Sequence, residues 1–423
     1  MTGTGSYERD LVALVVRRVG RLEDTGDLWE PYRVVSPDGP VVDAVREYLN
    51  DLQAMGRSVA TQRSYGMDLL RWFRFLWAVE VPWDQATMAE ARDFCRWVQV
   101  GTKPAVTHWR CRGDGLPDDA RLVVAVANSP NPMTGKTPPG PKYAAVTAAH
   151  AETVLRDFYR FHLDTGTGPM VNPFPLSRRR RQGRPGAHHN PMEPHLNERV
   201  GRYRPKLVSK PPHCIPDDAF NELFAKLGPH RDRALVAFWV STGARASELL
   251  GARGEDVDPG QQLVTVIRKG SRAMQPLPAS PGSFVWLRLY QVGLHGLVPA
   301  GRDDPLWWTL ARPFRPLSYH AAYRMFSRAS ASLGANWSLH DLRHTAAYRM
   351  ARDPGMPLTD VQWILGHARL GTTQIYVTAP FEEVVASILA HYARRSEAAA
   401  HPTTAAAGYR PEPLDVLFGR PPA

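Results

Sequence analysis

The sequence predicts a mostly α-helical protein of two domains, the second of which carries a small antiparallel β-sheet. A chain of 423 residues is too long for one ordinary core and suits two domains with connecting segments. Apolar residues recur at helical spacing through both halves, whereas the alternation typical of strands is clear in residues 263–277. A proline-containing, basic stretch at residues 174–212 separates the two halves.

The net charge of +11 and the pI near 9.7 favour a polyanionic partner, either nucleic acid or an anionic membrane surface. No apolar run approaches the ~18 residues of a membrane-spanning helix. The N-terminus lacks the apolar block of a secretory signal, so we expect a cytoplasmic protein. Three separated cysteines without CxxC spacing indicate reduced thiols, with neither a disulfide framework nor a thiolate zinc site: Cys95, Cys111 and Cys214.

The first half predicts an N-terminal arm at residues 1–40 and a helical domain at residues 41–173. Four helices are expected in this domain, with an insertion at residues 101–142 before the last one. Within the insertion, only residues 122–126 are rich enough in β-branched residues to suggest a strand. The helices are predicted to begin near Asp43, after Ser58, after Thr87 with its capping-box partner Glu90, and near Tyr143.

The segment at residues 174–212 predicts a basic, extended linker, because its composition cannot form a core. It either lies along a phosphate backbone, where each cation releases a condensed counterion, or is simply solvated. In the first case, DNA binding should weaken steeply with salt. The candidate DNA-contacting residues are Arg178, Arg179, Arg180, Arg181, Arg184, Lys206 and Lys210.

The second half predicts a mainly helical domain at residues 213–395, followed by a flexible tail at residues 396–423. Its one hairpin, at residues 263–277, has Lys269 at the tip. A helix at residues 381–392 is expected either to contact another protomer or to pack within its own chain. Other helices are expected after Pro216, from Asp232 to Trp239, after Ser318, from Ser338 and from Thr359 to Leu365, with Gly366 closing the last.

Several of the candidate functional residues would be unremarkable one by one. Arg245 and Glu248 lie one helical turn apart, which is the usual spacing of a surface ion pair. A lysine in a turn is ordinarily solvated, and a tyrosine after an apolar helix, such as Tyr376, is ordinarily a core residue.

Taken together, four motifs occur in a fixed order: TGARASELL, RKGSR in a hairpin, LHDLRHTAA and LGHARLGTTQIYV. In this order and at these separations the sequence resembles the tyrosine recombinase, or phage integrase, family. The resemblance covers the C-terminal half, and residues 43–100 with 143–173 look like the family's helical core-binding domain. Two departures are Ala244, where the family often has a larger apolar residue, and Arg268, where it often has glycine.

The resemblance implies a site-specific recombinase that breaks and rejoins double-stranded DNA through a 3′-phosphotyrosine, without a metal or other cofactor. Such enzymes serve integration, excision or transposition of a mobile element. The two domains are expected to form a C-shaped DNA clamp, and four protomers to assemble on DNA, in some cases with an accessory DNA-bending or directionality factor. Localisation would be nucleoid-associated.

The resemblance also implies the role of each matching residue. Arg245 and Arg343 clamp the scissile phosphate, and Glu248 supports the first motif. Lys269 protonates the leaving 5′ oxygen, and Tyr376 attacks phosphorus. The two remaining members of the set hydrogen-bond the phosphate or assist proton transfer: His340 and His367.

This chemistry is also reasonable from the residue types alone. Guanidinium groups donate in a planar fork that matches phosphate oxygens, so two arginines can stabilise the charge of a pentavalent phosphorus. A tyrosine with an ordinary pKa of about 10 needs such a cationic pocket to attack near neutral pH.

Three other interpretations remain open at this point. His340 and His344 lie four residues apart and, with Asp341 and His367, superficially resemble a zinc-protease helix, although Arg343 beside a zinc ion would be unfavourable. His344 is otherwise expected to be packed or hydrogen-bonded. The chain could also be a relaxing topoisomerase that uses the same tyrosine, or a catalytically silent DNA-binding protein. Rival tyrosines without the motif context are Tyr319, Tyr323 and Tyr348.

Overall fold

The computed structural model describes residues 9–103, 129–138, 140–177, 200–207, 212–367, 370–376 and 388–394. The chain forms two compact units, Met1–Asn131 with Gly135–Ser209 and Pro132–Thr134 with Lys210–Ala423. We describe each unit by itself. The strand predicted at residues 122–126, most of the predicted linker and the predicted tail lie outside the described residues.

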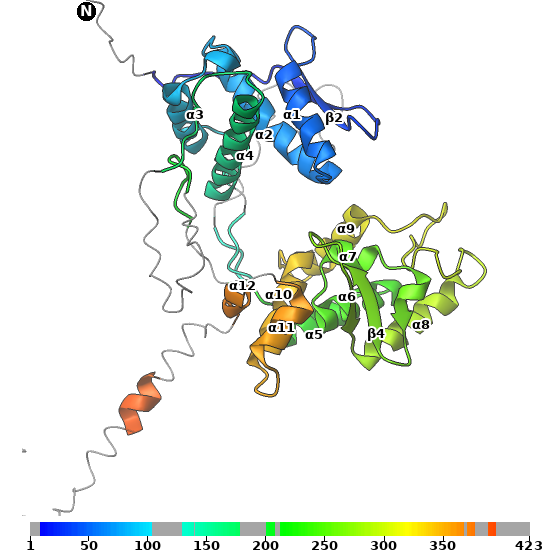
Figure 1. Cartoon of the computed structure of the whole chain (residues 1–423). Helices are drawn as coiled ribbons and strands as arrows, with labels where there is room; N and C mark the ends of the chain where they lie inside the picture. The colour runs from blue at the N-terminus through cyan, green and yellow to red at the C-terminus, as the bar shows by residue number, and fades with distance from the viewer. Residues whose placement is uncertain are drawn as a thin grey trace, which may run out of the picture. The chain divides into compact units, whose positions relative to one another are not determined.

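The described residues of the N-terminal unit form four α-helices, the number predicted (Figure 1). Ser58 caps the second helix by accepting from the backbone N–H of Thr61, and Thr87 with Glu90 forms the predicted capping box. Gly56, just after the first helix, has the left-handed φ of +70°. The elements are α1 (Asp43–Ala54), α2 (Val59–Ala78), the 3₁₀ turn η1 (Trp83–Gln85), α3 (Met88–Val100) and α4 (Ala145–Asp164).

An aromatic core joins these helices. Trp72 of α2 is fully buried and lies edge-on to Phe94 of α3 and Phe174, with ring centroids 5.1 and 5.3 Å apart. Its indole N–H donates to the Tyr159 hydroxyl at 2.9 Å, which in turn donates to the carbonyl of Trp83. The aromatic residues Trp72, Phe73 and Phe75 of α2 are thus core residues, and the indole N–H of Trp72 is satisfied.

The N-terminal arm contains a hairpin that the sequence pattern did not reveal. Its antiparallel strands are β1 (Arg21–Asp24) and β2 (Tyr32–Val35), and Val34 is fully buried in the helical core. Arg74 of α2 donates to the carbonyls of Val19 and Gly20 at 2.7 and 2.9 Å. The described part of the arm is thus attached to the helical unit.

Within the predicted linker, the described residues 174–177 and 200–204 also pack on this unit. Leu176 and Gly201 form an antiparallel bridge, and the Ser177 N–H donates to the carbonyl of Val200 at 2.8 Å. Arg204 donates to the Thr153 hydroxyl of α4 at 2.8 Å. Of the predicted DNA-contacting residues, Lys206 is described and exposed, whereas the others lie outside the described residues.

The C-terminal unit has its helices around a small sheet, again as predicted. The predicted hairpin is formed by β4 (Leu263–Ile267) and β5 (Met274–Pro278), with Val264 opposite Leu277, and β3 (Val257–Asp258) pairs with β4. The helical elements are α5 (Asp217–Lys226), α6 (His230–Thr242), α7 (Ala246–Leu250), the 3₁₀ turn η4 (Gly254–Asp256), α8 (Pro281–Leu294), α9 (Tyr319–Ala331), α10 (Leu339–Arg352), α11 (Leu358–Leu365) and α12 (Leu370–Gln374).

Helix α6 is the centre of this unit. It is apolar nearly all round, with every residue from Ala234 to Trp239 buried, and in Figure 1 it lies between α10 and α8. It ends at Gly243, whose φ of +62° favours glycine. Arg245 follows Gly243 by two residues. The end of this buried helix therefore sets the position of the Arg245 backbone.

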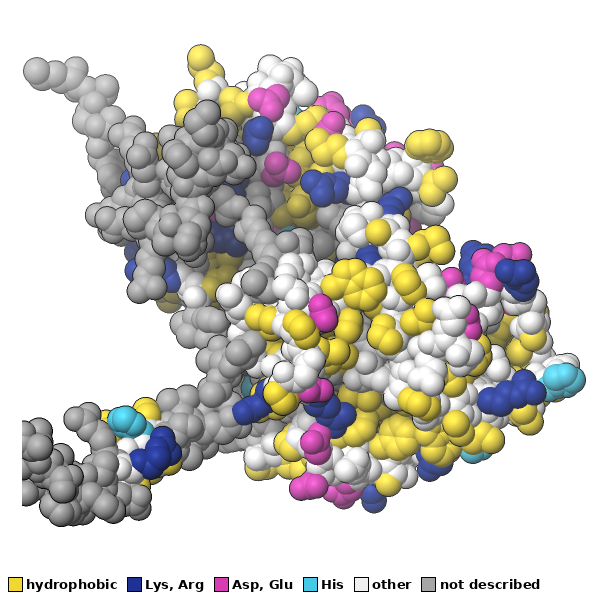
Figure 2. Space-filling model, turned by 60° about the horizontal axis from the view of Figure 1, so that its bottom comes forward, with side chains coloured by type: hydrophobic (Ala, Val, Ile, Leu, Met, Phe, Trp, Pro, Cys, Tyr) yellow, Lys and Arg dark blue, Asp and Glu magenta, His cyan; other side chains and the backbone are white. Residues whose placement is uncertain are grey.

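Hydrophobic side chains are exposed on the face of the C-terminal unit that Figure 2 presents. On α8, Leu287 and Tyr290 face the core, while Val285, Leu289 and Val292 are 41–59% exposed. Residues 388–394 are helical and overlap the end of the predicted helix at 381–392, whereas residues 381–387 lie outside the described residues. Among the described residues, every helix is too short or too polar to cross a membrane.

Candidate active site

A buried carboxylate organises the site. The Glu248 side chain is 1% exposed and accepts four hydrogen bonds. Its donors are the Arg245 guanidinium at 2.8 Å, the Arg268 guanidinium at 3.0 Å, and the backbone N–H groups of Arg245 at 3.0 Å and Lys269 at 2.9 Å. Burial acts to raise the pKa of Glu248, but these bonds outweigh it and lower the pKa. The expected surface pair of Arg245 and Glu248 is therefore the centre of a polar network.

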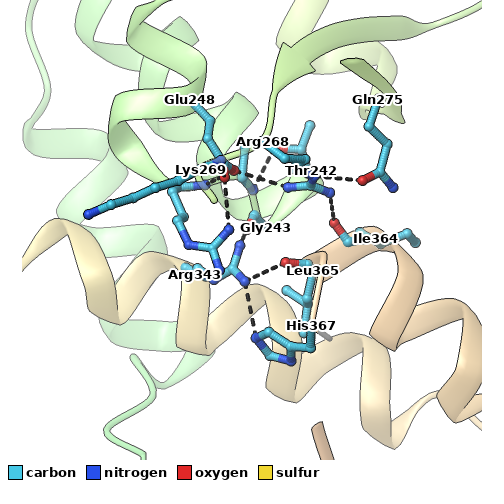
Figure 3. Close-up of polar contacts among 12 residues, drawn as sticks. Thr242, Gly243, Glu248, Arg268, Lys269, Gln275, Arg343, Ile364, Leu365 and His367 are labelled. Atoms are coloured by element: carbon cyan, nitrogen blue, oxygen red, sulfur yellow. Dashed lines mark hydrogen bonds and ion pairs between the residues drawn. The ribbon is translucent and has the colours of Figure 1, made fainter. Parts of the chain in front are cut away.

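Arg268 connects the hairpin to α11. It is 4% exposed, and each of its three nitrogens donates: Nε to Gln275 at 2.6 Å, Nη1 to Glu248 and Nη2 to the carbonyl of Ile364 (Figure 3). Burial lowers the pKa of Arg268 and the charge of Glu248 acts to raise it. The residue noted above as a departure from the family pattern is thus an inner member of the network.

Arg343 lies at the meeting point of α6, α10 and α11. It is 4% exposed and donates to the carbonyls of Gly243 and Leu365, both at 2.6 Å (Figure 3). Burial, and then the positive charge of Arg245, lowers the pKa of Arg343 to about 10. With a third bond, to His367, the described partners use three of its five N–H donors, and two remain for an anion.

His367 is held in one tautomer by its neighbours. Arg343 can only donate, so Nε2 of His367 must accept at 3.1 Å, and Nδ1–H donates to the Thr373 hydroxyl at 3.0 Å. Burial, followed by the charges of Arg343 and Arg245, lowers the pKa of His367 from 6.5 to about 4. The imidazole is therefore neutral near pH 7 and acts as a hydrogen-bonding group there.

This depressed pKa predicts a pH dependence of stability. Below pH 6.5 the unfolded chain takes up a proton on His367 that the folded chain accepts only near pH 4, so the free energy of unfolding falls as pH decreases through this window. Because His367 is only partly buried, we expect its contribution between pH 7 and 5 to be about 1 kcal/mol. Urea unfolding followed by tryptophan fluorescence should show a smaller fall in His367→Gln than in the unmodified chain. If the free energy of unfolding fell equally in both proteins, His367 would not be the group responsible for this pH dependence.

Tyr376 is buried and its hydroxyl has one described partner. The side chain is 4% exposed, and the hydroxyl lies 2.7 Å from Nδ1 of His344. Burial raises the pKa of Tyr376, while the charge of Arg343 acts to lower it. A phenol that keeps its proton at neutral pH needs an acceptor before it can attack, and His344 is within hydrogen-bonding reach. The expectation that His344 is hydrogen-bonded agrees with this contact.

The predicted residues fall into two connected groups. The network around Glu248 brings together Arg245, the backbone of Lys269, Arg343 and His367. The second group consists of His340, His344 and Tyr376. His340 is exposed, its ring centroid lies 4.3 Å from that of His344, and His344 in turn contacts the Tyr376 hydroxyl. The two groups meet where the rings of His367 and Tyr376 stack with centroids 6.5 Å apart.

The Lys269 side chain stands apart from both groups. It is exposed at the hairpin tip and, in Figure 3, extends in the opposite direction from Arg268. Its backbone is fixed by Glu248, whereas its ammonium group projects outward. A long cation in this position can reach a molecule bound outside the network.

Charge is unbalanced within this site. Among the described residues, three guanidinium groups share this site with the carboxylate of Glu248, and the charge of Arg245 lowers the pKa of Arg268, of Arg343 and of His367. The side chain of Arg245 is 31% exposed, so the positive region is open to solvent on one side. Excess positive charge that is preorganised and partly open is the environment that binds a phosphate.

Three members of the site were not assigned a role from the sequence: Arg268, Gln275 and His344. Arg268 precedes a candidate lysine, and His344 follows a candidate arginine, but adjacency in sequence does not say which side chain points inward. Gln275 alternates with its strand neighbours and had no signal of its own.

The metal interpretation of the HDLRH motif can be compared with the geometry. Within the residues that the structure describes, no three His, Cys, Asp or Glu side chains lie close enough to hold a metal ion. Nδ1 of His344 instead contacts the Tyr376 hydroxyl.

Comparison with known sequences identifies related proteins. The model of the phage integrase family matches residues 217–383, and the model of the phage integrase N-terminal SAM-like domain matches residues 45–111. Tyrosine recombinase XerD of Neisseria meningitidis serogroup B is 31% identical over 179 residues, which is 41% of this chain and 60% of the relative. Tyrosine recombinase XerC of Serratia marcescens is 31% identical over 203 residues, 47% of this chain and 63% of the relative. The matches thus span less than two thirds of these relatives.

Solved structures show the same fold at low identity. The Tn1549 transposon integrase in complex with circular intermediate DNA has a TM-score of 0.51 and 14% identity, over 82% of this chain and 98% of that chain. A lambda integrase dimer bound to a COC′ core site has a TM-score of 0.50 and 15% identity, over 79% and 76%.

The two family models together cover more than half of the chain and include all four sequence motifs. The predicted fold class, a helical N-terminal domain and a mainly helical second domain with a small sheet, is confirmed. The chain belongs to the phage integrase family, the tyrosine recombinases.

Proposed function

We propose that this chain is a site-specific DNA recombinase that breaks and rejoins strands through a covalent 3′-phosphotyrosine intermediate. The observation that carries the proposal is the excess of guanidinium charge around Glu248, next to a tyrosine whose hydroxyl contacts a histidine. Each feature alone could serve only the fold, the arginines as ion-pair partners and the tyrosine as a core residue. Together they provide an anion site and a nucleophile with a proton acceptor.

In the first step the scissile phosphate occupies the positive region. Arg245 contributes its partly exposed guanidinium, and Arg343 contributes the two N–H donors that its described partners leave over. His367, neutral at pH 7, orients Arg343 through its acceptor nitrogen. These fixed dipoles and charges stabilise the extra negative charge as phosphorus becomes pentavalent.

In the second step the Tyr376 oxygen attacks phosphorus. The P–O bond to tyrosine forms as the bond to the 5′ oxygen breaks. The phenol proton passes to His344 at Nδ1, and the ring of His340 lies edge-on to that of His344. Lys269 donates a proton to the departing 5′ oxygen. Attack by a 5′ hydroxyl reverses these steps, so rejoining needs no external energy.

The proposed biological role is integration, excision or transposition of a mobile element. The related structures are of a transposon integrase and of lambda integrase, both described as bound to DNA. We propose double-stranded DNA as the partner and a tetramer on DNA as the active assembly, with an accessory DNA-bending or directionality factor in some reactions. The region at 41–173 and the basic residues of 174–212 would grip the DNA, within the nucleoid.

Trapping the covalent adduct tests this proposal. A set of overlapping duplexes would cover the DNA on both sides of the gene, and each duplex would be prepared with a single nick at a series of positions. Where the nick lies close to the cleavage point, cleavage releases a short fragment that diffuses away, and the strand cannot be rejoined. We expect one duplex to yield a protein–DNA adduct with a free 5′ hydroxyl, and peptide mapping to place the DNA on Tyr376. The complete absence of adduct across the set would overturn the proposal.

Two further measurements separate the alternatives. Efficient relaxation of a supercoiled plasmid that lacks the adduct-forming sequence would favour the topoisomerase interpretation. Adduct formation should be unchanged by EDTA; a loss that zinc restores would favour the metal interpretation.

A further inference from the structure

The tip of the β4–β5 hairpin is attached to the end of α11 by two side chains. Gln275 of β5 donates to the carbonyl of Trp363 at 2.9 Å, and Arg268, just after β4, donates to the carbonyl of Ile364. Gln275 also accepts from Nε of Arg268 at 2.6 Å, so the two side chains brace one another (Figure 3).

The end of α11 is well suited to receive them. The last carbonyls of a helix lack i+4 partners and carry the negative end of its dipole, and here that of Trp363 also accepts from the Gly366 N–H at 3.0 Å. The third of these carbonyls, that of Leu365, accepts from Arg343. Gly366 ends the helix with φ +61°, and a Cβ there would lie 3.1 Å from Nε of Arg268. Glycine therefore permits both the turn and the close approach of the guanidinium.

Glu248 holds the Arg268 side chain from the side opposite to α11. One oxygen of Glu248 accepts from Arg268, and the other accepts from the backbone N–H of Lys269. Successive residues of the hairpin are therefore held by one buried carboxylate. Because the Lys269 side chain itself is exposed, its position depends on how firmly this stretch of backbone is held.

We propose that Arg268, braced by Gln275, is a positioning residue that holds the hairpin tip against the C-terminus of α11 and so presents Lys269 to the leaving 5′ oxygen. This inference rests on the proposed function, in which Lys269 is the proton donor. Arg268 and Arg343 are equally buried, but all three nitrogens of Arg268 donate within the protein, whereas the described partners of Arg343 leave its Nε over. We therefore assign the phosphate contact to Arg343 and not to Arg268.

A substrate whose leaving group needs no proton isolates this role. The adduct-forming duplex is prepared in two forms, with oxygen or with sulfur at the 5′ bridging position of the scissile phosphate. When the P–S bond breaks, the sulfur leaves as a stable thiolate. A defect in proton donation should therefore disappear with sulfur, whereas a defect in phosphate binding or in tyrosine attack should persist.

We expect Arg268→Met to slow cleavage of the oxygen substrate by about 10²-fold, as loss of a general acid does, and to cleave the sulfur substrate within a few-fold of the unmodified chain. Arg268→Lys should behave like Arg268→Met, because the three acceptors surround a planar guanidinium and a single ammonium nitrogen cannot reach all of them. Gln275→Leu, which removes the brace without removing a buried charge, should show a smaller oxygen defect and the same rescue.

The matched control is Arg231, another buried arginine of this unit. It is 8% exposed and donates to Asp232 and to the carbonyl of Trp308, away from the site. Arg231→Met should change both substrates to the same extent. A sulfur rescue in Arg231→Met as well would overturn the proposal, because any loss of a buried arginine would then suffice.

The reference variant Lys269→Ala distinguishes a failure of the positioning role of Arg268 from a failure of the proposed role of Lys269. If Lys269→Ala is rescued by sulfur but Arg268→Met and Gln275→Leu are not, the positioning role is wrong and the proposed function stands. If Lys269→Ala is not rescued, the proposed role of Lys269 is wrong. Thermal unfolding of each variant shows which are folded, and Gln275→Leu keeps the test decisive if Arg268→Met does not fold.

Discussion

Replacing Tyr376 by phenylalanine is expected to abolish the covalent protein–DNA adduct. The change removes one oxygen, which is the atom proposed to attack phosphorus, and leaves a ring of the same shape in a side chain that is 4% exposed. Because no neighbouring group replaces that oxygen, adduct formation on the nicked duplex should fall by at least about 10³-fold. DNA binding measured by fluorescence anisotropy should remain within about two-fold, since the positive region around Glu248 is untouched.

Tyr323→Phe is the matched control for this substitution. Tyr323 lies on α9, is 42% exposed and belongs to the same unit. Adduct formation by Tyr323→Phe should equal that of the unmodified chain. A persistent adduct in Tyr376→Phe, or its loss in Tyr323→Phe, would show that Tyr376 is not the nucleophile.

Replacing Glu248 by glutamine is expected to cause the largest loss of stability among the site residues. The carboxylate is 1% exposed and accepts from two guanidinium groups and two backbone N–H groups. A neutral amide leaves Arg268 buried beside Arg245 without a compensating charge, which costs about 3–5 kcal/mol of unfolding free energy. Urea unfolding at pH 7 measures this loss. Cleavage should fall with it, because an amide has a single acceptor oxygen and cannot accept all four hydrogen bonds that hold Arg245, Arg268 and the Lys269 backbone.

Asp217→Asn provides the comparison for an exposed ion pair. Asp217 pairs with Arg349, with side chains that are 75% and 35% exposed. Solvent screens such a pair, so the substitution should cost less than about 1 kcal/mol. Similar costs for Glu248→Gln and Asp217→Asn would contradict the view that burial makes Glu248 the organising charge.

Local patterns were sufficient to predict most of the helices and their ends. The capping signals at Ser58, Thr87 and Ser318 depend on hydrogen bonds between residues two or three apart, and all three are present. Gly56 and Gly366 end helices with positive φ for an equally local reason. The hairpin carrying Lys269 follows from alternation within one short segment.

The hairpin in the N-terminal arm could not be predicted in the same way. Its strands have four residues each, too few for a period to be recognised. Their packing depends on α2, where Arg74 holds the carbonyls of Val19 and Gly20. Arg74 therefore makes a tertiary contact that the residue spacing within α2 does not reveal.

By itself, the sequence determined the fold class, the order of the four motifs and the residue types that can bind a phosphate and attack it. The tertiary structure alone decided that Glu248 is buried rather than on the surface, that Arg268 points inward while Lys269 points outward, and that His344 is the partner of the Tyr376 hydroxyl. The physical reason is distance along the chain. These contacts join residues 20 to 100 positions apart, so their burial and charge environment arise only when α6, α10, α11 and the hairpin pack together.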